Sequence, residues 1–329
     1  MVVNGLFICS FKMKKFLNKI FYTVLLLIGS LYGISILYDS ALSNNVNIKA
    51  SYIQKHKIDA NILIEGPCVP HFMIYPKLME QITGKSVYNL SLPHSNFADN
   101  FLHLYLYLKN NTPPEYLFIY ATPESMDERY NTFSAYRFAP YVYDSVVHEV
   151  VKECDPAYAN WLNIPFMNYA YYGDRVNFFV LQGIKHYVMR KQHPVFPKGY
   201  EPNFFQEWDY TFEACLANNV EGAMYHWNEL HEKYLRKIIA LAHQNGIKVY
   251  LYESPVLEET IAHMPNRKEL LARLTNVASE NGVQYILFEN MDMAKHKSYY
   301  TSPVNTNLLG AKIFTDSLGR FINSLAPHN

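Results

Sequence analysis

Residues 241–253 read LAHQNGIKVYLYE, and this stretch decides the fold class that we predict. An amphipathic helix is expected over Tyr225–Gln244, it ends at Asn245-Gly246, and a short apolar strand follows over Lys248–Tyr252. Glycine terminates a helix in this way because it adopts the left-handed conformation without a Cβ penalty. The pattern therefore predicts a helix that is followed directly by a buried strand.

The same pattern occurs twice more, in residues 76–90 (PKLMEQITGKSVYNL) and in residues 277–288 (VASENGVQYILF). Alternating strands and helices imply parallel pairing, and short, continuously apolar strands are typical of a sheet covered on both faces. We therefore expect an α/β three-layer sandwich with about five parallel strands. The remaining strands are expected at Asn61–Gly66 and Tyr116–Tyr120, and the remaining helices at Asn96–Lys109 and Asn307–Leu325.

This pattern is interrupted between residues 125 and 222, where the chain is aromatic, contains many prolines and shows no clear strand. We predict a helical insertion there, which is either a lid over the strand ends or an element that only adds packing. The α/β domain is then expected to span residues 58–329. Residues 41–57 are polar and are predicted to be a tether.

The tether is preceded by an apolar segment, Ile20–Tyr38, that contains no charged residue. At about 1.5 Å per residue this segment nearly crosses a hydrocarbon layer of about 30 Å. A lysine cluster ending at Lys19 precedes it and Asp39 follows it. The positive-inside rule then predicts a single-pass anchor in the inner (cytoplasmic) membrane. Residues 1–40 form the cytoplasmic stub and anchor, and the large domain is periplasmic, or more generally extracytoplasmic.

Two alternatives concern this N-terminal region. A cleaved signal peptide would need a small-x-small site, which the segment 40–43 (SALS) provides poorly. The second alternative concerns the translation start. Met13 begins the sequence MKKFLNKI, which is more typical of a protein's N-terminus. Either Met1 or Met13 is then the first residue, and residues 1–12 are an added extension if it is Met13.

Composition and motif spacing exclude several functional classes. The 29 lysines and arginines balance 29 aspartates and glutamates, whereas a nucleic-acid-binding protein usually carries a basic surface. The four cysteines form no CxxC pair and the histidines form no HExxH motif, so we predict no metal site and no cofactor. A disulfide between Cys154 and Cys215 and a pair of buried thiols remain as alternatives.

Ligands of open parallel sheets bind beyond the carboxyl ends of the strands. This rule selects four loops and the segment that precedes the last helix. They are residues 66–71 (GPCVPH), 92–95 (LPHS), 121–124 (ATPE), 253–255 (ESP) and 302–307 (SPVNTN).

These segments resemble the SGNH (GDSL-type) hydrolase superfamily over residues 58–325, apart from the insertion. The resemblance rests on the Gly-x-x turn after the first strand, on the segment 87–93 (VYNLSLP), and on Asn307, Gly310 and Ala311 at the last helix. The chain is most similar to membrane-anchored members that accompany acyl-transfer machinery for cell-envelope glycans. The resemblance therefore implies a glycan ligand and a membrane acyltransferase as partners, in addition to the membrane itself.

The resemblance also assigns site residues by position. It implies a nucleophile at Cys68, an oxyanion glycine near His94, and the family's late Asp-x-x-His at Ser302 and Asn305. Positions for oxyanion or substrate binding are expected at Gly66, Asn89, His94 and Glu253. No Gly-x-Asn-Asp block follows the third strand, where this chain has Ala121-Thr122-Pro123-Glu124.

The departures from the family pattern predict impaired catalysis. Ser-His-Asp chemistry needs an imidazole to accept the proton of the nucleophile and a carboxylate to orient that imidazole. Asn305 cannot exchange a proton near neutral pH, and Ser302 cannot stabilise an imidazolium. One alternative is an active esterase or O-acyltransferase in which Cys68 is the nucleophile and His71 or His94 replaces the base. Another is a structural partner subunit of a membrane acyltransferase.

Overall fold

The computed structural model describes residues 3–130, 133–218, 222 and 224–325. The chain divides into two compact units. The first, which we call the helical unit, comprises Met1–Ile48 and Ala135–Lys191. The second, the sheet unit, comprises Lys49–Ser134 and Gln192–Asn329 and contains every strand of the sheet.

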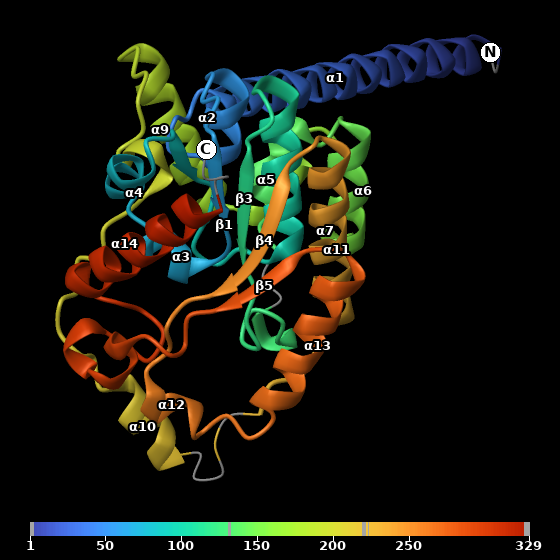
Figure 1. Ribbon diagram of the computed structural model, residues 1–329. Helices are drawn as coiled ribbons and strands as arrows, with labels where there is room; N and C mark the ends of the chain where they lie inside the picture. The colour runs from blue at the N-terminus through green and yellow to red at the C-terminus, as the bar shows by residue number, and fades with distance from the viewer. Residues whose placement is uncertain (1–2, 131–132, 219–221, 223, 326–329) are drawn as a thin grey trace. The chain divides into compact units, whose positions relative to one another are not determined.

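A five-stranded parallel sheet forms the centre of the sheet unit (Figure 1). The strand order is β2-β1-β3-β4-β5. The chain therefore enters the sheet at β1, adds β2 as the edge strand on one side, and then adds β3, β4 and β5 in sequence on the other side. The fold class predicted from the sequence, a parallel α/β sheet of about five strands, is confirmed. The strands are β1 (Ile62–Glu65), β2 (Val87–Asn89), β3 (Tyr116–Tyr120), β4 (Lys248–Glu253) and β5 (Gln284–Leu287).

Helices cover both faces of this sheet (Figure 1). The helices α3 (Cys68–Met73), α4 (Pro76–Thr83) and α14 (Leu308–Ser324) cover one face. The helices α5 (Phe97–Asn110), α11 (Glu229–Gln244) and α13 (Arg267–Glu280) cover the other. All residues of β1 and β3 are buried, as expected for strands with a helical layer on each side.

The helix ends that decided the fold prediction have the expected geometry. Gly84, Gly246 and Gly282 have φ values of 67°, 71° and 66°, which place them in the left-handed region. Helix α11 begins at Glu229, four residues later than predicted, because the Asn228 side chain caps it by accepting from Leu230 N at 2.9 Å.

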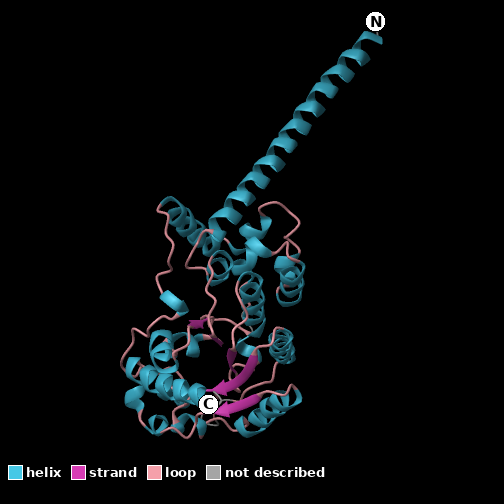
Figure 2. Cartoon of the chain, turned by 45° about the horizontal axis from the view of Figure 1, so that its top comes forward, coloured by secondary structure: helices cyan, strands magenta, loops and turns pink. Residues whose placement is uncertain are grey.

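The helical unit contains helix α1 (Val3–Ser43), which runs without interruption (Figure 2). Its stretch Met13–Ser43 is long and apolar enough to span a membrane, and the most apolar window of that stretch is exposed. The unit also contains α6 (Ser145–Cys154), α7 (Pro156–Ala159), α8 (Met167–Tyr172) and α9 (Asp174–Val188). Within the predicted insertion, residues 135–191 are mainly helical and belong to this unit. The described residues of the insertion on either side of this range belong to the sheet unit and are mostly not helical.

The segment 41–57 is not the tether that we predicted. Helix α1 continues to Ser43, and helix α2 (Lys49–Lys55) follows within the sheet unit. Ala50 and Ile53, three residues apart on α2, are fully buried. The segment looked polar as a whole, but its few apolar residues recur at helical spacing and pack inward. The Cys215 side chain lies outside the described part of the structure, so the Cys154–Cys215 disulfide remains a prediction.

Candidate functional site

The turn after β1 places Cys68 beside the neighbouring strand β3. Gly66 has a φ of 152°, and a Cβ atom there would lie 2.7 Å from both Pro70 Cγ and Tyr120 Cβ. Only glycine fits this close approach without displacing the start of α3. Cys68 is the first residue of α3 and is partly exposed.

The loop after β2 is bound to this turn through the Gly66 carbonyl oxygen. That oxygen accepts hydrogen bonds from Leu92 N at 3.0 Å and from Ser95 Oγ at 3.2 Å. His94 lies between these two donors and has a φ of 55°, a conformation that glycine adopts more readily than histidine. The loop therefore presents an exposed imidazole next to the start of α3.

Helix α5 supplies buried amide groups to the same region. Its first turn is fixed by a capping box, because Asn96 Oδ1 accepts from Asp99 N at 3.1 Å and Asp99 Oδ2 accepts from Asn96 N at 3.1 Å. Asn100, one residue further along, is 1% exposed, and its Oδ1 atom has no hydrogen-bond partner among the described residues.

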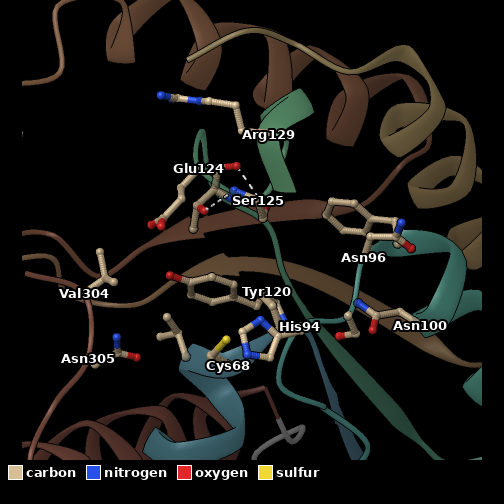
Figure 3. A pocket seen from close by; sticks show the side chains of 15 residues that line it. Cys68, His94, Asn96, Asn100, Tyr120, Glu124, Ser125, Arg129, Val304 and Asn305 are labelled. Atoms are coloured by element: carbon tan, nitrogen blue, oxygen red, sulfur yellow. Dashed lines mark hydrogen bonds between the residues drawn. The ribbon is translucent and has the colours of Figure 1, made fainter. Parts of the chain in front are cut away.

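The turn after β3 is closed by two reciprocal hydrogen bonds. Thr122 N donates to Ser125 Oγ at 2.8 Å and Ser125 N donates to Thr122 Oγ1 at 3.0 Å (Figure 3). Nearby, Arg129 Nε donates to Asp127 Oδ1 at 2.8 Å, so this guanidinium already has a carboxylate partner.

The segment before α14 forms a tight turn that carries Asn305. Ser302 N and Thr301 N both donate to the Asn305 carbonyl oxygen, at 3.3 and 2.8 Å. Asn305 Nδ2 donates to Ser302 Oγ at 3.0 Å, whereas Asn305 Oδ1 is buried and has no partner in the described ranges. Asn307 then caps α14 by accepting from Leu309 N and Gly310 N.

These pieces enclose a cavity of about 210 Å³ at the carboxyl ends of β1 and β3 (Figure 3). In a parallel sheet with this strand order, β1 and β3 are the adjacent strands at which the order reverses, and ligands bind at that position. Cys68, His94 and Asn305 line the same cavity. Its other lining residues are Pro67, Val69, Ser95, Asn96, Phe97, Asn100, Tyr120, Thr122, Glu124, Ser125, Arg129 and Val304.

His71 is not placed as a substitute base. It does not line the cavity, its Nδ1 atom lies 2.9 Å from the Ser91 carbonyl oxygen, and its Nε2 atom lies 3.2 Å from Glu201 Oε2. Burial lowers the pKa of its imidazole, and the hydrogen bond with Glu201 opposes that shift. Of the two histidines considered, only His94 shares a cavity with Cys68.

Asn89 has a structural environment rather than an oxyanion-binding one. Its Nδ2 atom donates to the carbonyl oxygens of Pro70 and Ile74, at 2.8 and 3.3 Å, and its Oδ1 atom accepts from Ser91 N at 3.0 Å. The side chain is fully buried and joins α3 to the end of β2. Ser302 is also not among the residues that line the cavity, and its Oγ atom accepts a hydrogen bond from Asn305 Nδ2.

Glu253 belongs to a buried ion pair at the end of β4. Arg267 Nη1 and Nη2 donate to its two carboxylate oxygens at 2.8 and 2.7 Å, and Arg267 also contacts Glu289 Oε2 at 3.1 Å. Burial raises the pKa of Glu253 and Arg267 opposes this. The bidentate pair holds α13 to the sheet and leaves no carboxylate oxygen without a partner.

Two residues with unusual environments were not singled out from the sequence. Asn100 is one, and its only sequence signal is an amide within the apolar stripe of a helix. The other is Glu65, the last residue of β1, which is fully buried with neither carboxylate oxygen hydrogen-bonded to any described residue. Burial raises its pKa well above the usual range, although Lys49 acts in the opposite direction.

Comparisons with known proteins do not add to this description. No family model matches the chain, and no curated protein is similar to it. Among the described residues, no group of three or more His, Cys, Asp or Glu side chains is placed to hold a metal ion. The fold and the cavity define the chain as a parallel α/β protein with a ligand-sized site at the switch point of its sheet.

Proposed function

We propose that this protein is a membrane-anchored, extracytoplasmic protein of the SGNH-hydrolase type whose site binds a cell-envelope glycan or its O-acyl group but is catalytically impaired. The observation that carries the proposal is that Asn305, a residue without acid–base chemistry, lines the same cavity as Cys68. In the mechanism that the resemblance implies, the proton of a nucleophile at Cys68 is accepted by an imidazole at the position that Asn305 occupies.

The backbone around the cavity supports the family assignment. His94 holds a left-handed conformation at the position where the resemblance implies an oxyanion glycine. Ser302 and Asn305 are hydrogen-bonded to each other, as the two late members of a triad would be. The geometry of a hydrolase site is therefore compatible with these positions, whereas the side chains that would transfer protons are different.

The cavity lining supports a ligand that carries hydroxyl groups. Two amide oxygens, Asn100 Oδ1 and Asn305 Oδ1, are buried without a partner in the described structure, and both residues line the cavity. A molecule the size of water does not reach either oxygen, so a hydroxyl on the ligand would need a rotation of the amide to donate to it. It would then recover the cost of an unsatisfied buried acceptor, which is about 1–3 kcal/mol. Sugar hydroxyls are such donors, and Tyr120 and Phe97 supply aromatic surface in the same lining.

A second candidate function is favoured by one observation, namely that His94 and Cys68 share the cavity (Figure 3). An imidazole near a thiol can activate it as a nucleophile, so an active esterase or O-acyltransferase is the alternative. It predicts that iodoacetamide alkylates Cys68 faster than Cys154 in the folded protein, and that His94→Gln removes the difference.

The deciding experiment is hydrolysis of p-nitrophenyl acetate by the purified full chain in detergent. The proposal expects the same rate for the native protein and for Cys68→Ala. Turnover well above background that disappears in Cys68→Ala and in His94→Gln would replace the proposal with the esterase.

A gain-of-function variant tests the geometric part of the proposal separately. The triple variant Cys68→Ser, Ser302→Asp and Asn305→His restores the implied triad, and we expect it to hydrolyse the ester. The matched control, Cys68→Ser with Ser302→Asp, lacks the imidazole and is expected to remain inactive. Retention of the protein by an immobilised cell-envelope polysaccharide, weakened by Asn100→Leu, would support glycan binding directly.

A further inference from the structure

Helix α9 of the helical unit has an exposed apolar face that none of the described residues covers. Its inward residues, Val176, Val180 and Gly183, are buried. Its outward residues follow the same helical spacing, and Leu181 and Val188 are 68% and 72% exposed. The exposed apolar side chains of this face and of the residue that ends the helix are Phe178, Leu181, Ile184, Val188 and Met189.

The inward side of α9, opposite to this exposed face, packs against the end of the apolar helix α1. Tyr38 Oη donates to Asn177 Oδ1 at 2.9 Å, and Asn45 Nδ2 donates to the Phe179 carbonyl oxygen at 2.9 Å. A Cβ atom on Gly183 would lie 1.8 Å from the Ala41 carbonyl oxygen, so the two backbones are in contact there. Helix α9 is thus fixed along α1 over the range of residues 38–45.

That range corresponds to a particular depth in a bilayer. The uncharged segment Ile20–Tyr38 is about 28 Å long at 1.5 Å per residue, which matches a hydrocarbon layer of about 30 Å. Tyr38 therefore falls at the outer edge of the hydrocarbon, and α9 begins at that level. A helix held at this depth with an apolar outer face contacts lipid acyl chains or headgroups.

The side chains on α9 fit the membrane interface better than a protein core. Tyr187 is 70% exposed, and aromatic side chains with a polar end are enriched at headgroup level. Arg175 and Lys185 are exposed near the two ends of the helix, where cationic side chains extend to lipid phosphates.

We propose that α9 is an interfacial membrane helix whose Phe178–Met189 face inserts into the outer leaflet beside α1. The inference rests on the membrane anchoring that is part of the proposed function. It adds a second membrane contact, which holds the helical unit at the bilayer surface instead of leaving it attached by α1 alone.

The test uses the full chain in phosphatidylcholine proteoliposomes, with the four native cysteines replaced by alanine. Single cysteines replace Leu181 on α9, Leu26 in α1, and Leu309 in the sheet unit, and each carries an NBD fluorophore. All three native side chains are exposed, so the substitutions leave the core intact. Lipids with brominated acyl chains are expected to quench the probes at positions 181 and 26, but not the probe at 309.

The outcomes separate the two proposals. A probe at position 26 that is not quenched would refute membrane anchoring itself. Quenching at 26 without quenching at 181 would overturn the interfacial helix while leaving the anchor intact. A cysteine at 181 that is protected from a water-soluble maleimide in native membranes, but reacts freely in proteoliposomes, would also overturn it, because a protein partner would then cover this face.

Discussion

Replacing Glu65 with glutamine should change how the stability of the protein depends on pH. Glu65 is fully buried at the end of β1, and burial holds its pKa well above the usual range of a glutamate. Between the ordinary pKa of about 4.3 and the raised value, the folded protein keeps a proton that the unfolded chain has released. The stabilising contribution of this proton is therefore complete below pH 4 and is lost as the pH rises through that window.

The magnitude follows from the one proton involved. Within the window the free energy of unfolding falls by about 1.4 kcal/mol for each pH unit, since folded and unfolded states differ by one bound proton. Glu65→Gln is neutral at every pH and removes this slope. For a unit of this size, 1 kcal/mol corresponds to a shift of roughly 2–4 °C in Tm.

The measurement is the difference in Tm and in urea midpoint between the native chain and Glu65→Gln from pH 4 to pH 8. Glu115→Gln is the matched control, because a hydrogen bond from Lys85 holds the pKa of Glu115 below its usual range. The contribution of that carboxylate is present above its unfolded pKa and is lost as the pH falls, so its difference curve has the opposite sign. A Glu65→Gln difference that stays constant from pH 4.5 to pH 7 would show that Glu65 ionises normally and would refute the reasoning.

Three further substitutions test the packing around the site and the anchor. Gly66→Ala should lower the free energy of urea unfolding of the sheet unit by roughly 2–3 kcal/mol, because the new Cβ atom would lie 2.7 Å from two side-chain carbons at a φ of 152°. The control is Gly246→Ala, which has open space around it and should lower this free energy by only about 1 kcal/mol. Arg267→Met should lower the free energy of unfolding by about 3 kcal/mol, because it leaves Glu253 buried without its partner. The double variant Arg267→Met with Glu253→Met should recover most of this stability. A double variant as unstable as Arg267→Met alone would contradict the prediction. Gly183→Leu should separate α9 from α1 and expose residues 135–191 to limited proteolysis, whereas unchanged digestion would argue against the close contact with Ala41.

The sheet could be predicted because its signals are local. Each of three helices ends at a glycine that the backbone requires, and an apolar strand begins within a few residues. Which strands become neighbours is a tertiary property, so the order β2-β1-β3-β4-β5 could not be derived from the strands alone. The prediction of a tether over residues 41–57 was wrong because the burial of these residues also depends on tertiary structure, namely on surfaces that are distant in the sequence.

The site was predictable to the extent that strand ends define it. Cys68, His94 and Asn305 were expected at such ends, and all three line one cavity. His71 was also expected there, but its ring contacts Ser91 and Glu201 instead, and the position of Glu201 lay within a segment without recognisable pattern. Asn100 was missed because a single amide in an apolar helix carries no signal until the cavity beside it is known.

The amide residues of the cavity lining also bear on whether the cavity is a binding site. The buried amide oxygens of Asn100 and Asn305 add about 1–3 kcal/mol each while they lack donors. A leucine at either position would remove such a cost, so folding alone does not account for an amide at these positions. The amide side chains that line the cavity are therefore better explained by binding than by folding.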